Sequence, residues 1–200
     1  MSSTASSVGG GVAGSLGGAA ARVRVRPVTD DEAFLLGALH LQALRRAGTA
    51  PDPGPPSHVQ AFARSWQQRS ADLPAWVAEC DGQHVGMAIC RVPMLPRLAR
   101  SVPELVALEP LTGEPVGPGG GDGPRAANGA AGGGAAGGGP AGLTAEAVCL
   151  ALVRAVVTWF GREGYLAVDV APEVRVPPAV LDAARADVLP QRRISLPTRP

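Results

Sequence analysis

The stretch WVAECDGQHVGMA, residues Trp76 to Ala88, decides the fold because it predicts two strands joined by a tight turn. Asp81-Gly82 lies between two apolar runs, residues 75–80 and 84–92. Glycine tolerates the positive backbone dihedral that a two-residue hairpin turn requires. We therefore expect an antiparallel hairpin here.

A strand and a capped helix are expected before the hairpin. Residues 22–28 alternate Arg and Val with a period of two, which is typical of a strand with one buried face. Pro27 closes that strand. Thr29 then begins the sequence TDDE, in which Glu32 can reach back to its backbone as a capping box. The first helix should run to about Gly48.

A second helix and a further strand are expected on either side of the hairpin. Ser57 and Gln60 repeat the capping pattern, and apolar residues follow at helical spacing to about Arg69. After the hairpin, the segment ELVAL, residues 104–108, predicts another strand, which ends at Glu109-Pro110.

The C-terminal half begins with a low-complexity segment. Residues 117–142 are mostly Gly and Ala and predict a flexible loop insertion. Thr144 can cap a long helix that should end at Gly164, and a buried strand follows at residues 165–170. A last short helix is expected within residues 177–187. Because a crossover helix connects them, this strand should lie parallel to the strand before the loop.

Composition limits the functional classes. The formal charge of +1 gives no electrostatic case for binding nucleic acid or an anionic membrane. The longest apolar run, Ala147 to Phe160, contains an arginine and is too short to span a bilayer. All 18 basic residues are Arg, and Gly, Ala and Pro abound, which points to a compositional bias of the genome.

The cysteines favour a reducing compartment. Their count is odd and their spacing irregular, so a disulfide scaffold is not expected. The first residues lack the charged start and apolar run of a signal peptide, and a cytoplasmic location follows. Cys80, His84 and Cys90 match no zinc-binding spacing, and no metal site is expected.

The order of elements resembles the GNAT superfamily of N-acetyltransferases. Four phrases carry the resemblance: RVRPVTDDEAFLLGALH (24–40), the hairpin phrase, LVALEP (105–110) and ALVRAVVTWFGREGY (151–165). It covers about residues 22–172 and implies an α+β fold. In this fold a mixed sheet, flanked by helices, has a central antiparallel hairpin and a parallel strand pair splayed around the cofactor cleft.

The resemblance also implies a domain organisation. A disordered Ser/Gly/Ala-rich tail (1–21) would precede the GNAT-like domain (22–176), which contains a low-complexity insertion at about 112–142. The remaining segment, 177–200, has diverged and is expected to be poorly ordered.

A function follows from the resemblance: transfer of an acetyl group from acetyl-coenzyme A to an amine of a small molecule or protein. The coenzyme's pantetheine arm would pair with the fourth strand, and its pyrophosphate would meet backbone N–H groups before the long helix. Glu109 is the candidate general base, acting through water. The candidate cofactor-binding residues are Leu108, Gly137, Gly138, Gly139, Ala141, Gly142, Leu143 and Thr144.

Departures from the family pattern keep alternatives open. The family has the motif Q/R-x-x-G-x-G/A after the fourth strand, whereas LTGEPVG follows Pro110 here. The family's late tyrosine has no counterpart after the fifth strand. One alternative is a catalytically degenerate GNAT-like module that serves protein interaction or regulation, and another is an unrelated small α/β domain. The acceptor amine and the oligomeric state, a homodimer included, stay open.

Overall fold

The computed structural model describes residues 22–49, 55–92, 102–112, 142–185, 187–188 and 194–198. The helices are η1 (Asp30–Glu32), α2 (Ala33–Arg46), α3 (Pro55–Gln67), α4 (Ala145–Arg162) and α5 (Pro178–Ala183). The strands are β1 (Arg24–Pro27), β2 (Ala75–Cys80), β3 (Gln83–Arg91), β4 (Glu104–Pro110), β5 (Ala167–Val170), β6 (Asp187–Val188) and β7 (Ile194–Pro197). The predicted tail at 1–21 and most of the predicted insertion lie outside the described residues.

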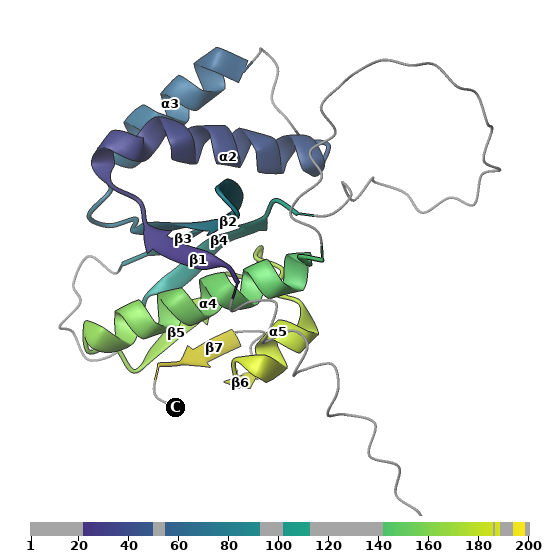
Figure 1. Ribbon diagram of the computed structural model, residues 1–200. Coiled ribbons are helices and arrows are strands. Elements are labelled where there is room, and N and C mark those ends of the chain that lie inside the picture. Colours follow the sequence, from purple (N-terminus) through teal and green to yellow (C-terminus); the bar gives the residue numbers. More distant parts are fainter. Residues whose placement is uncertain are drawn as a thin grey trace, which may run out of the picture.

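These strands form one mixed sheet in the order β1-β2-β3-β4-β5-β7-β6. Neighbouring strands are antiparallel except for the parallel pair β4–β5. Helices α2 and α3 cover one face of the sheet, and α4 and α5 cover the other (Figure 1). The predicted α+β class, with its antiparallel hairpin and its parallel pair, is confirmed.

Local signals in the sequence form the contacts that they predict. The Thr29 N–H donates to Glu32 Oε2 at 3.1 Å, so the first helical turn is capped as expected. Thr144 Oγ1 accepts from the N–H three residues further along α4, also at 3.1 Å. Asp81 and Gly82 adopt positive φ values of 51° and 77° in the hairpin turn. These boundaries depend on a few neighbouring residues.

Two boundaries differ from expectation. Helix α3 begins at Pro55, two residues before the predicted cap Ser57, because proline is well suited to the first turn of a helix. The C-terminal segment contributes β7, which pairs along the whole of β5 and buries Leu196 completely. The sequence predicts no strand there, since this short strand between β5 and β6 is fixed by its pairing with β5, a partner remote in the chain.

The sheet divides the apolar interior into two layers. The α4 layer includes Trp76, Leu105, Leu152 and Phe160, and the α2 layer includes Leu36, Trp66, Met87 and Ile89. Burial of these side chains is the main stabilising contribution to the fold. Within the described residues, no helix is both long enough and apolar enough to cross a bilayer.

Helix α4 packs tightly against the sheet at Gly86. A Cβ atom there would lie 2.6 Å from Val148 Cγ1 and 3.0 Å from the Glu109 carbonyl oxygen. Only glycine leaves room for this approach. The packing fixes the first turns of α4 over the C-terminal end of β4.

Candidate functional site

The parallel strands β4 and β5 pair over only two residues of β4. Glu104 lies opposite Asp169 and Leu105 opposite Val170, and the backbone N–H of Ala171 donates to Leu105 O at 3.0 Å. Beyond this point the described residues of β4 pair with β3 alone. Residues 106–110 therefore present an open strand edge, which is the splay that the resemblance implies.

A bulge in β4 decides which backbone groups face that edge. The register of β3 and β4 shifts between Ile89 and Cys90, leaving one extra residue, Val106, in β4. The Cys90 N–H donates to Pro74 O, so the polar groups of Cys90 face β2 and those of Ile89 face β4. Ala107, opposite Ile89, is then bonded to β3. The N–H and C=O of the next residue in β4 consequently face the open edge.

That residue is Leu108, which the sequence named as a cofactor-binding candidate through its backbone. Without the bulge, alternation from Leu105 would turn the Leu108 N–H toward β3. The Leu108 side chain is buried in the α4 layer, which holds the strand in register. The position thus combines a fixed side chain with a backbone donor and acceptor that face the unpaired edge of β4.

A cavity of about 370 Å³ adjoins the open edge. Its walls are β4 residues 106–110 on one side and Glu173, Val174 and Arg175 on the other. The latter three follow β5 after two intervening residues. The sequence reasoning missed them as site residues, although the residues after a parallel strand are expected at the same edge of the sheet as its neighbour's end.

Glu109 lies on the α2 face of the sheet. It is opposite Met87, a residue of the α2 layer, and side chains opposite each other in a ladder share a face. Glu109 also lines the cavity. Burial raises the pKa of Glu109 above its usual range. A carboxylate with a raised pKa is a better proton acceptor at neutral pH, as a general base requires.

The start of α4 is the second part of the predicted site. Gly142, with φ of 80°, lies beside Leu143 and the capping residue Thr144. Glu146 follows in the first turn and is exposed. The helix dipole attracts anions to this end, but the Glu146 carboxylate already offsets part of that field. The other predicted coenzyme-loop residues, Gly137, Gly138, Gly139 and Ala141, lie outside the described residues.

The three cysteine thiols are free and buried. Burial, with the carboxylates of Glu109 and Glu146 nearby, raises the pKa of Cys149 to about 12. Desolvation raises the pKa of Cys90 well above its ordinary value. Thiols in this state are poor nucleophiles. Among the described residues, no three His, Cys, Asp or Glu side chains gather as a metal-binding group.

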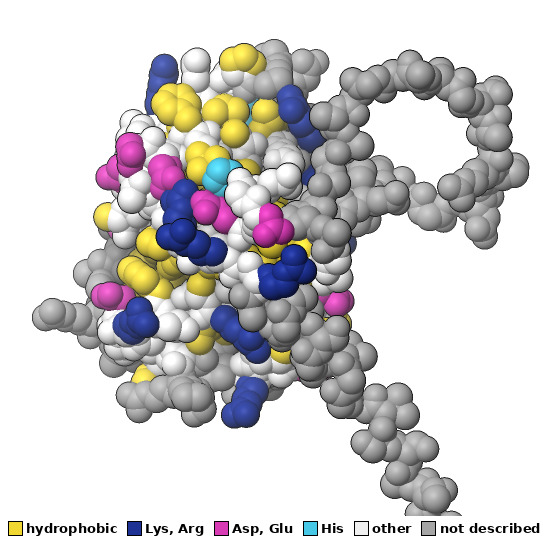
Figure 2. Space-filling view, in the orientation of Figure 1, with side chains coloured by type: hydrophobic (Ala, Val, Ile, Leu, Met, Phe, Trp, Pro, Cys, Tyr) yellow, Lys and Arg dark blue, Asp and Glu magenta, His cyan; other side chains and the backbone are white. Residues whose placement is uncertain are grey.

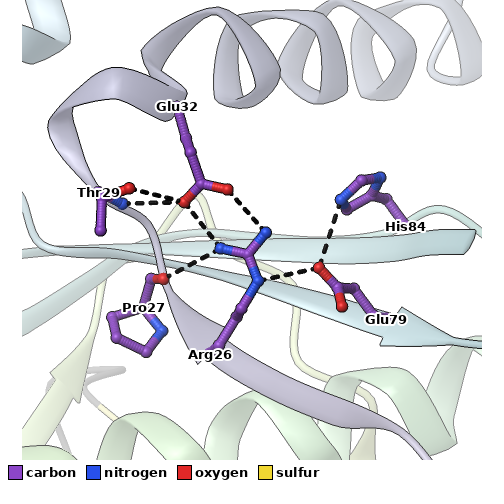
Figure 3. Close-up of polar contacts among 6 residues, drawn as sticks. All are labelled: Arg26, Pro27, Thr29, Glu32, Glu79 and His84. Atoms are coloured by element: carbon purple, nitrogen blue, oxygen red, sulfur yellow. Dashed lines mark hydrogen bonds and ion pairs between the residues drawn. The ribbon is translucent and has the colours of Figure 1, made fainter. Parts of the chain in front are cut away.

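A polar network lies at the β1 end of the sheet, away from β4 and β5. The Arg26 guanidinium donates to Glu32 Oε2 at 2.7 Å and to Glu79 Oε1 at 3.0 Å, and His84 Nε2 lies 3.4 Å from Glu79 Oε1 (Figure 3). The hydrogen bond from Arg26 lowers the pKa of Glu32 to about 2. These contacts connect β1, η1, β2 and β3, and we assign them a structural role.

Two histidines connect α2 to α3. His40 Nδ1 and His58 Nε2 lie 3.1 Å apart, with nearly parallel rings, and Phe62 stacks on His40. Burial, followed by the charge of His58, lowers the pKa of His40. The sequence places both histidines at the surface or boundary of helices, and both are half-buried.

Solved structures of N-acetyltransferases are similar to this chain. PaiA N-acetyltransferase from Thermoplasma acidophilum, in complex with coenzyme A, is 8% identical over 86% of this chain and 96% of that one, with a TM-score of 0.43. Aminoglycoside N-acetyltransferase AAC(6')-Ib11 is 16% identical over 88% and 96%, with a TM-score of 0.42. Ribosomal-protein-alanine N-acetyltransferase from Brucella melitensis biovar Abortus 2308 is 19% identical, with a TM-score of 0.34.

The match to the Brucella protein covers 44% of this chain and 57% of that protein's chain, which is less than two thirds of its length. No protein-family model and no curated protein sequence matches this chain. The GNAT-like assignment of the fold rests on the chain's own strand order and on the splay between β4 and β5.

Proposed function

We propose that this chain is an N-acyltransferase that moves an acetyl group from acetyl-coenzyme A to an amine of a small molecule or protein. The single observation that carries the proposal is the open edge of β4, where the bulge turns the Leu108 N–H into a cleft. A pantetheine arm contains amide groups, which can pair with a strand edge as another strand does.

The chain's own groups suit the steps of acyl transfer. Glu109, through water, accepts the proton that the attacking amine loses. The amine nitrogen then forms a bond to the thioester carbonyl carbon, the bond from that carbon to sulfur breaks, and the coenzyme A thiolate leaves and takes up, through water, the proton that the nitrogen gives up as the amide forms. A backbone N–H at the open edge stabilises the negative charge that develops on the carbonyl oxygen. Most of the rate enhancement would come from holding the two substrates in position.

The coenzyme would also contact the beginning of α4. Gly142, Leu143 and Thr144 place backbone groups near the C-terminal end of β4, and Gly137, Gly138, Gly139 and Ala141 belong to the same proposed loop. Arg175 in the opposite wall supplies a cation, whereas the sequence of residues 137–144 contains none. Three buried, free thiols suit the cytoplasmic location proposed from the sequence.

Binding of acetyl-coenzyme A to the whole chain, measured by calorimetry, tests the proposal. We expect saturable binding that weakens at least tenfold in Leu108→Pro, which removes the N–H at the open edge. Leu108→Ala shortens the side chain but keeps the N–H, and it should bind as the wild type does. Absence of binding heat and of thermal stabilisation at saturating acetyl-coenzyme A would contradict the proposal.

A degenerate, non-catalytic module is the second candidate, because Glu146 occupies the helix end where an anion would bind. Turnover separates the two candidates. With a panel of amines, Glu109→Gln should lower kcat about a hundredfold or more while leaving coenzyme binding intact. Coenzyme binding without transfer to any amine in the panel would favour the degenerate module.

A further inference from the structure

A groove runs across the free edge of β1. In the sheet, β2 and β3 separate β1 from the proposed acyl-coenzyme A cleft at β4. Two adjoining cavities of about 310 and 390 Å³ share Pro27, Trp76 and Trp159 as walls. Trp76 and Trp159 pack edge to face, with ring centroids 5.6 Å apart. Hydrophobic side chains gather between β1 and α4, with basic side chains beside them (Figure 2). We call this surface the β1 groove.

The β1 edge carries backbone groups that face outward. β1 is the first strand in the sheet order, so β2 pairs with one side of it. The Val28 N–H donates to Ala75 O, which turns the polar groups of Val28 toward β2. By alternation, Arg26 also faces β2 and Val25 faces outward. An extended peptide can therefore hydrogen-bond to Val25 at the edge of the groove.

The charge at the α4 end of the groove is positive. Arg154 and Arg162 line that cavity together with Thr158 and apolar residues, and no acidic side chain does. Both arginines are exposed, and neither forms a salt bridge within the described part of the chain. Asp30 lines only the other cavity. Carboxylates would complement the two arginines.

We propose that the β1 groove binds an extended acidic peptide segment of a partner protein. The peptide would pair with the outward backbone of Val25, place an apolar side chain against Pro27 and Trp159, beneath which Trp76 is buried, and direct carboxylates toward Arg154 and Arg162. A tryptophan-lined groove flanked by arginines has the composition typical of binding surfaces.

Other occupants fit the charge less well. A second copy of the chain pairing through β1 would bring its own Arg24 toward this Arg24, and its β1 segment, residues 22–28, contains no carboxylate to complement Arg154 and Arg162. Residues 1–21 carry no charged side chain, so they offer nothing to complement Arg154 and Arg162. An acidic partner is the occupant that the groove favours.

Titration of the full chain with capped hexapeptides, followed by tryptophan fluorescence and calorimetry, tests the proposal. In Thr-Leu-Thr-Glu-Thr-Glu, the period of a strand places Leu and both Glu on one face. We expect this peptide to bind at least tenfold more tightly than Thr-Leu-Thr-Lys-Thr-Lys. Binding should weaken as salt increases, since the charges are exposed.

The double variant Arg154→Glu, Arg162→Glu should lose the preference for the acidic peptide. Arg64→Glu, an exposed change on α3 outside the groove, should bind as the wild type does. The proposal is overturned if the acidic and basic peptides bind equally, if the double variant binds like the wild type, or if no binding occurs up to about 1 mM. A dimer in light scattering that the double variant abolishes would instead make the groove a self-interface, which also overturns it.

Discussion

The sheet is built differently at β1 to β3, which we call the closed side, and at β4 and β5, which we call the open side. At β1, β2 and β3, the strands pair along their lengths, and the Arg26 network connects them to the first helical turn. At β4 and β5, two residue pairs join the strands before they separate. The difference teaches that this chain places its polar cross-connections where neighbouring strands pair throughout, and these connections leave the outer edge of β1 unpaired within the described residues. Where the sheet is open, a bulge leaves backbone hydrogen-bonding groups free for a ligand.

The largest expected loss of stability comes from a proline substitution in β4, and its size should differ between two neighbouring positions. Ala107→Pro removes an N–H that bonds to β3 and should destabilise the fold by about 3 kcal/mol. Leu108→Pro removes an N–H at the open edge, so it should cost little more than Leu108→Ala. Chemical denaturation of the three variants measures this. Equal losses in the two proline variants would mean that the bulge does not orient β4 as described.

Substitution of Gly86 tests how tightly α4 packs against the sheet near the end of β4. Gly86→Ala places a Cβ within 2.6 Å of Val148 Cγ1 and should destabilise the fold by about 2 kcal/mol. The paired variant Gly86→Ala, Val148→Ala removes the clashing methyl groups and should recover part of that loss. If Gly86→Ala has wild-type stability by thermal denaturation, the close approach is not a constraint.

The closed side should show an acid-dependent contribution from Glu32. Because the Arg26 hydrogen bond lowers the pKa of Glu32 from 4.5 to about 2, its stabilisation is present above pH 4.5 and is lost as the pH falls through about 2. Glu32→Gln should cost about 1 kcal/mol at pH 7, and the difference from the wild type should shrink toward pH 2. Asp31→Asn, an exposed neighbour, is the control. A pH-independent difference for Glu32→Gln would contradict the assignment.

The smallest expected effect concerns the open side. Under the proposed function, Glu146→Gln removes a negative charge from the start of α4 and should tighten acetyl-coenzyme A binding by about two- to fivefold at low salt. Glu163→Gln, at the other end of the same helix, is the matched control. Unchanged affinity in Glu146→Gln would place the coenzyme's phosphates away from this helix end.

Much of the closed side could be predicted from the sequence, because its signals are local. Asp81-Gly82 specifies the turn, and Thr29 specifies the start of a helical segment within three residues of itself. Short-range patterns of this kind depend little on the rest of the chain.

The open side depends on contacts between distant residues. The extra residue Val106 shows only in the register of β3 against β4, and β7 becomes a strand only because β5 offers it an edge. Glu109 was identifiable because it ends a predicted strand. Arg175 was not, since its place in the cleft wall follows from how the chain leaves β5.

Amide exchange by NMR, with and without saturating acetyl-coenzyme A, tests the central claim most directly. The claim is that the open edge of β4 binds the coenzyme as an added strand. It predicts that exchange of the Leu108 amide slows markedly on binding, whereas the Ala107 amide, already bonded to β3, changes little. If acetyl-coenzyme A binds while exchange at Leu108 is unaltered, the coenzyme lies elsewhere and the account is contradicted.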